Sequence, residues 1–144
     1  MPQSNRETGD AFHRLAHVAL EGFTGKRFRL NVALPVGRPP RLHKFDFATD
    51  DNGFVGESKC YTWTATDNAP SAKIGHLKEA LQYLHDLPKG TTTFIVMKRH
   101  CRRKDGEPLA DYFVRLNANW LEETAILELD EGTATLRLVH GSLT

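Results

Sequence analysis

The sequence predicts an α/β (α+β) fold with a mixed central sheet. Segments with apolar residues at helical spacing alternate along the chain with segments in which every second residue is apolar. One strand-like segment, Thr92–Met97, is apolar on both faces, which is typical of a central strand covered on two sides. No internal repeat, low-complexity stretch or linker divides the 144 residues. We therefore expect residues 1–144 to form one domain.

The first helix is predicted from about Asp10, a good N-cap, to Phe23, and Gly25 ends it. The apolar residues at helical spacing are Phe12, Leu15, Ala16, Ala19 and Phe23. The first ten residues of the chain are expected to be frayed.

Two strands follow, over about 28–34 and 42–48, and a turn over 35–40 separates them. Alternation in the second strand predicts that Phe45 and Phe47 point to one side and that Asp46 points to the other. Residues 50–53, Asp-Asp-Asn-Gly, are a hairpin signal. A third strand is expected from Phe54 to about Thr64.

The rest of the chain predicts a helix from the cap Ser71 to about residue 87, a strand over 92–97 and a helix from Pro108 to about Asn117. A closing hairpin pairs residues 126–130 with 133–139. The order of elements is αβββαβ, followed by a helix and a ββ hairpin.

Composition excludes several classes of protein. The two cysteines lie far apart, so a disulfide framework or a zinc ribbon is not expected. His13 and His17 are interpreted as surface or core-edge residues and not as a zinc site. No apolar run approaches the ~20 residues that span a bilayer, and the N-terminus does not resemble a signal peptide. We expect a cytoplasmic protein that does not enter a membrane.

The net charge of +1 conceals an asymmetry. Residues 1–104 contain 17 Lys and Arg against 10 Asp and Glu, whereas residues 105–144 contain 2 against 8. The basic residues are densest over 98–104. This cluster could neutralise phosphates, or it could be a solvated loop after a strand.

Asp46, Glu57 and Lys59 are the candidates for chemistry. Residues two apart in a strand share a face, so Glu57 and Lys59 point the same way, and the register of the hairpin can bring Asp46 beside them. Two carboxylates and a lysine are costly to bury unless a charge compensates them, and a divalent cation with oxygen ligands would do so. The alternative is a cross-strand salt bridge on the surface.

This order of elements, with an Asp late in the second strand and Glu-x-Lys in the third, resembles the PD-(D/E)XK (restriction-endonuclease-like) nuclease superfamily. The resemblance covers about residues 10–98 and leaves about 105–144 as a C-terminal elaboration. It implies that Asp46, Glu57 and the backbone carbonyl of Ser58 bind Mg²⁺ or Mn²⁺, and that Lys59 is the catalytic lysine. It further implies a carboxylate from the first helix, for which Glu21 is the candidate. Phe45 occupies the position at which the family name has proline.

The resulting hypothesis is metal-dependent hydrolysis of phosphodiester bonds in nucleic acid. DNA is expected as the substrate in preference to RNA. The basic residues expected to guide the nucleic acid are Arg29, Arg41, Lys44, Lys73, Lys98, Arg99, Arg102 and Arg103. Tyr61 and Trp63 either stack on bases or pack in the core. The alternative function is a catalytically inactive nuclease-like fold that binds nucleic acid or protein. A homodimer stays open.

Overall fold

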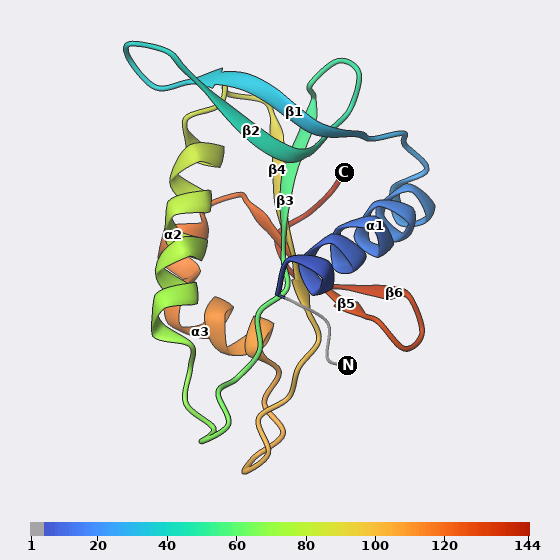
Figure 1. Cartoon of the computed structure of the whole chain (residues 1–144). Coiled ribbons are helices and arrows are strands. Elements are labelled where there is room, and N and C mark those ends of the chain that lie inside the picture. The colour runs from blue at the N-terminus through green and yellow to red at the C-terminus, as the bar shows by residue number, and fades with distance from the viewer. Residues whose placement is uncertain (1–4) are drawn as a thin grey trace.

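The computed structural model describes residues 5–144, which form one six-stranded sheet and three helices (Figure 1). The helices are α1 (Asn5–Thr24), α2 (Ser71–His85) and α3 (Leu109–Leu121). The strands are β1 (Arg29–Val36), β2 (Arg41–Ala48), β3 (Phe54–Lys59), β4 (Thr92–Lys98), β5 (Ala125–Asp130) and β6 (Thr135–His140). The predicted order of elements and the α+β class with a mixed sheet are therefore confirmed.

The strands lie in the sheet in chain order. β1, β2 and β3 are antiparallel, β3, β4 and β5 are parallel, and β6 returns antiparallel to β5. α2 and α3 are the crossovers that parallel neighbours require. β4 is buried from Thr93 to Met97, as expected for a strand covered on both faces.

α1 covers one face of the sheet, and α2 and α3 cover the other (Figure 1). The cluster under α1 includes Phe12, Ala16, Leu20, Phe47, Phe94 and Val96. The cluster under α2 and α3 includes Phe45, Val55, Leu77, Leu81, Ile95 and Phe113. Each large apolar side chain buried in this way contributes roughly 1.5–3 kcal/mol to folding.

α1 begins earlier than predicted. Residues 5–10 are helical and not frayed, and residues 1–4 lie outside the described part of the chain. The end of the helix agrees with the prediction: Gly25 has a φ of 70°, and its N–H donates to the carbonyl of Glu21 at 2.9 Å.

β3 ends at Lys59 and not at about Thr64. Beyond it the chain is held by other contacts, since the Trp63 N–H donates to His100 Nδ1 at 3.0 Å and its indole N–H donates to the Glu107 carbonyl at 3.1 Å. Trp63 is buried, so it packs in the core and is not free to stack on bases.

Two helix boundaries also differ from the predictions. Ser71 is the first residue of α2, and Pro70 occupies the cap position without a side-chain hydrogen bond. α3 continues past Asn117, whose backbone departs from helical geometry, to Leu121. Among residues 5–144, no helix is both long and apolar enough to cross a lipid bilayer.

The β1–β2 ribbon bends at Asn31 and Asp46. These two residues form no ladder pair, although their neighbours on both strands do. Asn31 has a φ of 55°, in the left-handed region that Asn tolerates better than most residues. Because of the bend, Phe45 joins the cluster under α2 and α3, and Phe47 joins the cluster under α1. The prediction that both phenylalanines share one side is wrong, since strict alternation holds only along a regular strand.

Candidate active site

Asp46 lies where β2 and β3 separate. The ladder between these strands ends at the pair Phe47–Gly56. Continued by two residues, it would pair Ser58 with Phe45, whose carbonyl would accept the Ser58 N–H. Instead, Asp46 Oδ2 accepts that N–H at 2.8 Å. The carboxylate therefore replaces a backbone acceptor and is held in the gap between the two strands.

Glu57 lies on the α2 side of β3 and is only 5% exposed. Its Oε1 lies 3.2 Å from Nε2 of His43 on β2. The His43 ring is stacked on Tyr83 of α2, with centroids 3.8 Å apart, and meets Phe45 edge-on at 4.6 Å. A histidine fixed by two aromatic rings thus fixes the orientation of the buried carboxylate.

Asp46, Glu57 and Lys59 line one cleft of about 330 Å³, which we call the acidic cleft. Its other lining residues are His43, Lys44, Tyr61, His76, Glu79, Ala80 and Tyr83. Glu57 and Lys59 reach it from alternate positions of β3, and Asp46 reaches it from the bend of β2. The fold thus brings together the three residues that the sequence singled out.

Burial and neighbouring charges shift the pKa of three side chains of the acidic cleft, Glu57, Tyr61 and His43. Burial, followed by the nearby Asp46 carboxylate, raises the pKa of Glu57 to about 9, and Lys59 opposes this only in part. Burial is also the main cause that raises the pKa of Tyr61 to about 12, and the charge of Glu57 adds to it. Burial and then Lys59 lower the pKa of His43. Without a cation, Glu57 therefore keeps its proton at neutral pH.

The donor set of the acidic cleft suits magnesium or manganese in number and kind. Within residues 5–144, no group of three or more His, Cys, Asp or Glu side chains is arranged to hold a metal ion. Mg²⁺ typically takes one or two carboxylates and keeps water or phosphate oxygens in its other positions. The carboxylates of Asp46 and Glu57 fit this pattern, because Asp46 has acceptor capacity beyond its bond to Ser58. The Ser58 carbonyl as a ligand stays a prediction.

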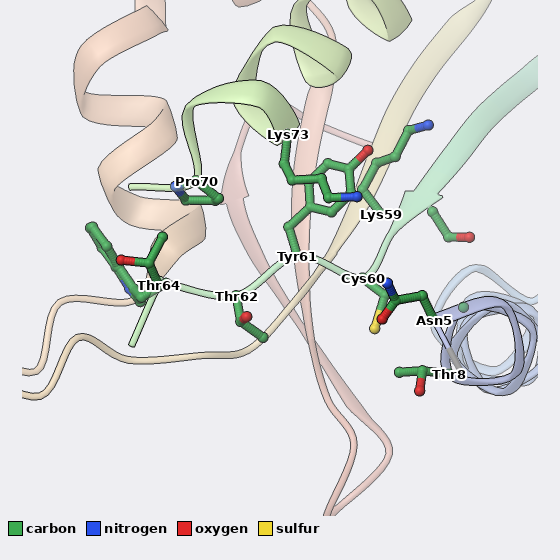
Figure 2. A pocket seen from close by; sticks show the side chains of 12 residues that line it. Asn5, Thr8, Lys59, Cys60, Tyr61, Thr62, Thr64, Pro70 and Lys73 are labelled. Carbon is green, nitrogen blue, oxygen red and sulfur yellow. The ribbon is translucent and has the colours of Figure 1, made fainter. Parts of the chain in front are cut away.

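A second cleft of about 500 Å³ adjoins the acidic cleft, and we call it the outer cleft (Figure 2). Residues 60–64, beyond the end of β3, form its floor. The first turns of α1 and α2 form its walls through Asn5, Thr8 and Lys73. Lys59 and Tyr61 line both clefts, so the two clefts meet at these side chains.

Glu21 does not line the acidic cleft. Its Oε2 accepts the N–H of Phe28 at 3.0 Å and lies 3.3 Å from Nε2 of His17. The side chain therefore connects α1 to the start of β1. The α1 residue that approaches the site is His13, whose Nδ1 lies 3.3 Å from the Ser58 hydroxyl and 3.9 Å from Asp46 Oδ1.

The basic cluster over 98–104 is largely neutralised within the protein. Its ion pairs are Lys98–Glu131 at 3.2 Å, Arg99–Glu128 at 2.9 Å, Arg102–Asp105 at 2.7 Å, Arg102–Glu107 at 3.2 Å and Arg103–Asp67 at 3.2 Å. The Arg102 guanidinium also lies 4.4 Å from the centre of the Trp63 ring. These contacts hold the loop against the rest of the protein. They also pair the basic side chains that were expected to bind the phosphates of nucleic acid.

The other predicted nucleic-acid residues divide into two groups. Arg29 holds the β2–β3 turn through the Thr49 carbonyl at 3.1 Å and the Asn52 side chain at 2.6 Å. Arg41 is exposed at the start of β2. Lys44 lines the acidic cleft, and Lys73 lines the outer cleft. Only these last two lie beside the candidate site.

Sequence reasoning missed His13, His43 and Glu79. His43 is three residues before Asp46, and Glu79 is a helix residue that alternates with the apolar stripe of α2. Alternation places His43 on the same side as Phe45, opposite to Asp46, so the pattern of the strand gave no signal for it. The approach of His13 depends on how α1 docks, which local patterns do not report.

Neither a family model, nor a curated protein, nor a solved structure matches this chain.

Proposed function

We propose that this protein hydrolyses phosphodiester bonds in nucleic acid with Mg²⁺ or Mn²⁺ bound by Asp46 and Glu57. The observation that carries the proposal is the position of Asp46, whose carboxylate replaces a strand carbonyl and so lines the same cleft as Glu57 and Lys59. The antiparallel β1–β3 and the parallel β4 are consistent with a restriction-endonuclease-like core.

The charges in the acidic cleft support a cation between the carboxylates. Asp46 and Glu57 lie close enough to raise the pKa of Glu57, and Glu79 adds a third acid to the lining. When bound, a divalent cation would acidify a water and offset charge on the phosphate. Two carboxylates and no third side-chain ligand leave coordination positions for these oxygens.

Each side chain has a role that its position supports. Asp46 and Glu57 would hold the cation, and His43 would keep Glu57 oriented through the 3.2 Å contact. Lys59 would donate to a non-bridging phosphate oxygen and stabilise the charge that grows there. Tyr61 keeps its hydroxyl proton, because its pKa is about 12, and can donate a hydrogen bond to the same phosphate.

The test is cleavage by purified protein in Mg²⁺ or Mn²⁺ of a panel of single-stranded and duplex DNA and RNA. Glu57→Gln and Lys59→Ala should abolish cleavage and leave the circular dichroism unchanged. The matched controls are Glu123→Gln and Lys78→Ala, which change the same groups at exposed positions that do not line the acidic cleft. Equal activity of wild type and Lys59→Ala on every substrate would refute the proposal.

A catalytically inactive binding module is the second candidate. The pairing of Glu57 with His43 favours it, because a protonated Glu57 is satisfied there without a metal. Calorimetric titration with Mn²⁺ separates the two functions. Heat of binding that disappears in Glu57→Gln supports the enzyme, and no heat with wild type supports the module.

A further inference from the structure

The two clefts differ in charge. Three acids, Asp46, Glu57 and Glu79, line the acidic cleft, together with Lys44 and with Lys59, which also lines the outer cleft. Among residues 5–144, no Asp or Glu lines the outer cleft, whereas two lysines, Lys59 and Lys73, do. The acidic cleft therefore suits a bound cation, and the outer cleft suits an anionic group of a ligand that spans both clefts.

The charges of the outer cleft are available to a ligand. In the described part of the chain, neither Lys59 nor Lys73 is held in an ion pair, in contrast to the internally paired cations of the 98–104 loop. The Lys73 ammonium lies 5.5 Å from the centre of the Tyr61 ring. In Figure 2 the Lys73 side chain reaches from α2 over Tyr61, and Lys59 rises beside the same ring.

The remaining lining of the outer cleft is neutral and mixed in character. Asn5, Thr8, Thr62 and Thr64 supply amide and hydroxyl groups, and Tyr61 supplies an aromatic ring. Ammonium groups for a phosphate, an aromatic ring for a planar base and hydroxyl groups for base edges or sugar are the groups that bind one nucleotide unit.

We infer that the outer cleft binds one unpaired nucleotide of the substrate, next to the phosphate at Lys59, and that the substrate is consequently single-stranded or has a single-stranded end. The inference rests on the proposed function, since it extends the nucleic acid from the acidic cleft across Lys59 and Tyr61. Lys73 holds the neighbouring phosphate, and Tyr61 lies at the boundary between the two nucleotide positions.

The size of the outer cleft favours an unpaired nucleotide. Its volume of about 500 Å³ falls within the range for small-molecule sites, roughly 300–1,000 Å³. A base that enters such a cleft must leave its stack and its pairing partner, and this energy is smallest when the strand is already single. A duplex, whose bases stay stacked and paired, would not place a base in this cleft.

The first test measures binding without cleavage, in EDTA. Fluorescence anisotropy compares a labelled twelve-residue thymidylate strand, a ribo-uridylate strand of the same length and a duplex of twelve base pairs. Wild type should bind the single strands more tightly than the duplex. Lys73→Glu should weaken single-strand binding by about tenfold, because it removes a phosphate contact and adds repulsion.

Lys78→Glu is the matched control, since Lys78 is exposed on the same helix and lines neither cleft. The two variants have the same net charge, so a general electrostatic effect would weaken binding equally in both. A selective loss in Lys73→Glu supports the outer cleft as the site. Equal losses, tighter binding of the duplex, or no binding of either single strand would overturn the inference.

A second test locates the site with a small probe. Titration of isotope-labelled protein with thymidine 3′,5′-bisphosphate should shift amide resonances over 58–64 and in the first turns of α1 and α2, and Lys73→Glu should reduce these shifts. Shifts confined to other regions would contradict the assignment. Cleavage in Mn²⁺ without these shifts would leave the proposed function standing and remove the inference. Shifts without cleavage would keep the nucleotide site and remove the catalytic proposal.

Discussion

Asp46 accepts the backbone N–H of Ser58 at 2.8 Å through Oδ2, at the position where a regular antiparallel ladder would use a carbonyl. One residue thereby performs two tasks. It satisfies a donor that the separation of β2 and β3 would otherwise leave without its strand partner, and it anchors a carboxylate between the strands. The separation of β2 and β3 therefore both opens the acidic cleft and places the Asp46 carboxylate in it.

Asp46→Asn and Asp46→Ala should therefore differ in stability. The asparagine keeps an oxygen that can accept the Ser58 N–H, so its free energy of unfolding should fall by less than about 1 kcal/mol. The alanine leaves that donor without an acceptor and should lose about 1–3 kcal/mol. Urea denaturation followed by circular dichroism measures both. Equal stabilities of the two variants would show that the hydrogen bond does not support the fold.

Glu57 should make the metal-free protein less stable as the pH rises. Its pKa is about 9 in the folded protein and 4.5 in the unfolded chain. Between these values the folded state holds a proton that the unfolded state has released, so the free energy of unfolding falls with increasing pH. The slope is at most about 1.4 kcal/mol per pH unit. Urea denaturation in EDTA from pH 5 to pH 9 measures it.

Glu57→Gln is the control for this pH dependence, because the amide cannot titrate. Relative to the variant, wild type should lose unfolding free energy steadily from pH 5 to pH 9. If the two proteins show parallel profiles, Glu57 does not carry a raised pKa. Saturating Mg²⁺ should flatten the wild-type profile, since the cation favours the ionised carboxylate.

Gly56→Ala should destabilise the protein, because the added Cβ would lie 2.3 Å from Cε2 of Phe94 on the neighbouring strand. Overpacking of this kind typically costs about 1–3 kcal/mol and sometimes more. Gly75→Ala is the matched control: it has no heavy atom within 4 Å of its Cβ position, and in the interior of α2 it should gain about 0.5–1 kcal/mol. Thermal denaturation of both variants distinguishes close packing from a general effect of glycine replacement.

Arg137→Ala should destabilise the protein by about 2 kcal/mol, because it removes one of two arginines that pair with a buried carboxylate. Glu128 is 2% exposed, and its Oε1 accepts from Arg99 at 2.9 Å and from Arg137 at 3.0 Å. Arg115→Ala provides the comparison, since its partner Glu107 is more exposed and such surface pairs contribute ~1 kcal/mol or less. Chemical denaturation that ranks Arg115→Ala as the more harmful change would contradict the expectation.

Periodicity predicted the elements of the fold well because each depends on nearby residues. The doubly apolar β4 is buried as predicted, and so are Phe12 and Ala16 of the predicted α1 stripe, whereas Phe23 of that stripe and Leu30 of β1 are exposed. Local patterns failed where a distant contact decides the conformation. β3 stops at Lys59, and the chain beyond it is held by a contact that is remote in sequence, since the Trp63 N–H donates to His100, 37 residues further along the chain.

For the candidate site, the sequence determined which charged groups the chain offers and that Glu57 and Lys59 share a face, since the side-chain period of a strand is fixed by its covalent geometry. Only the tertiary structure decided that Asp46 joins them. Its position follows from a bend at Asn31 and from the early end of the β2–β3 ladder, which no alternation encodes. The tertiary structure also paired the basic loop with internal acids, and it placed the Glu21 carboxylate on the Phe28 N–H, away from the acidic cleft. These contacts depend on which groups are close in space, and not on which are close along the chain.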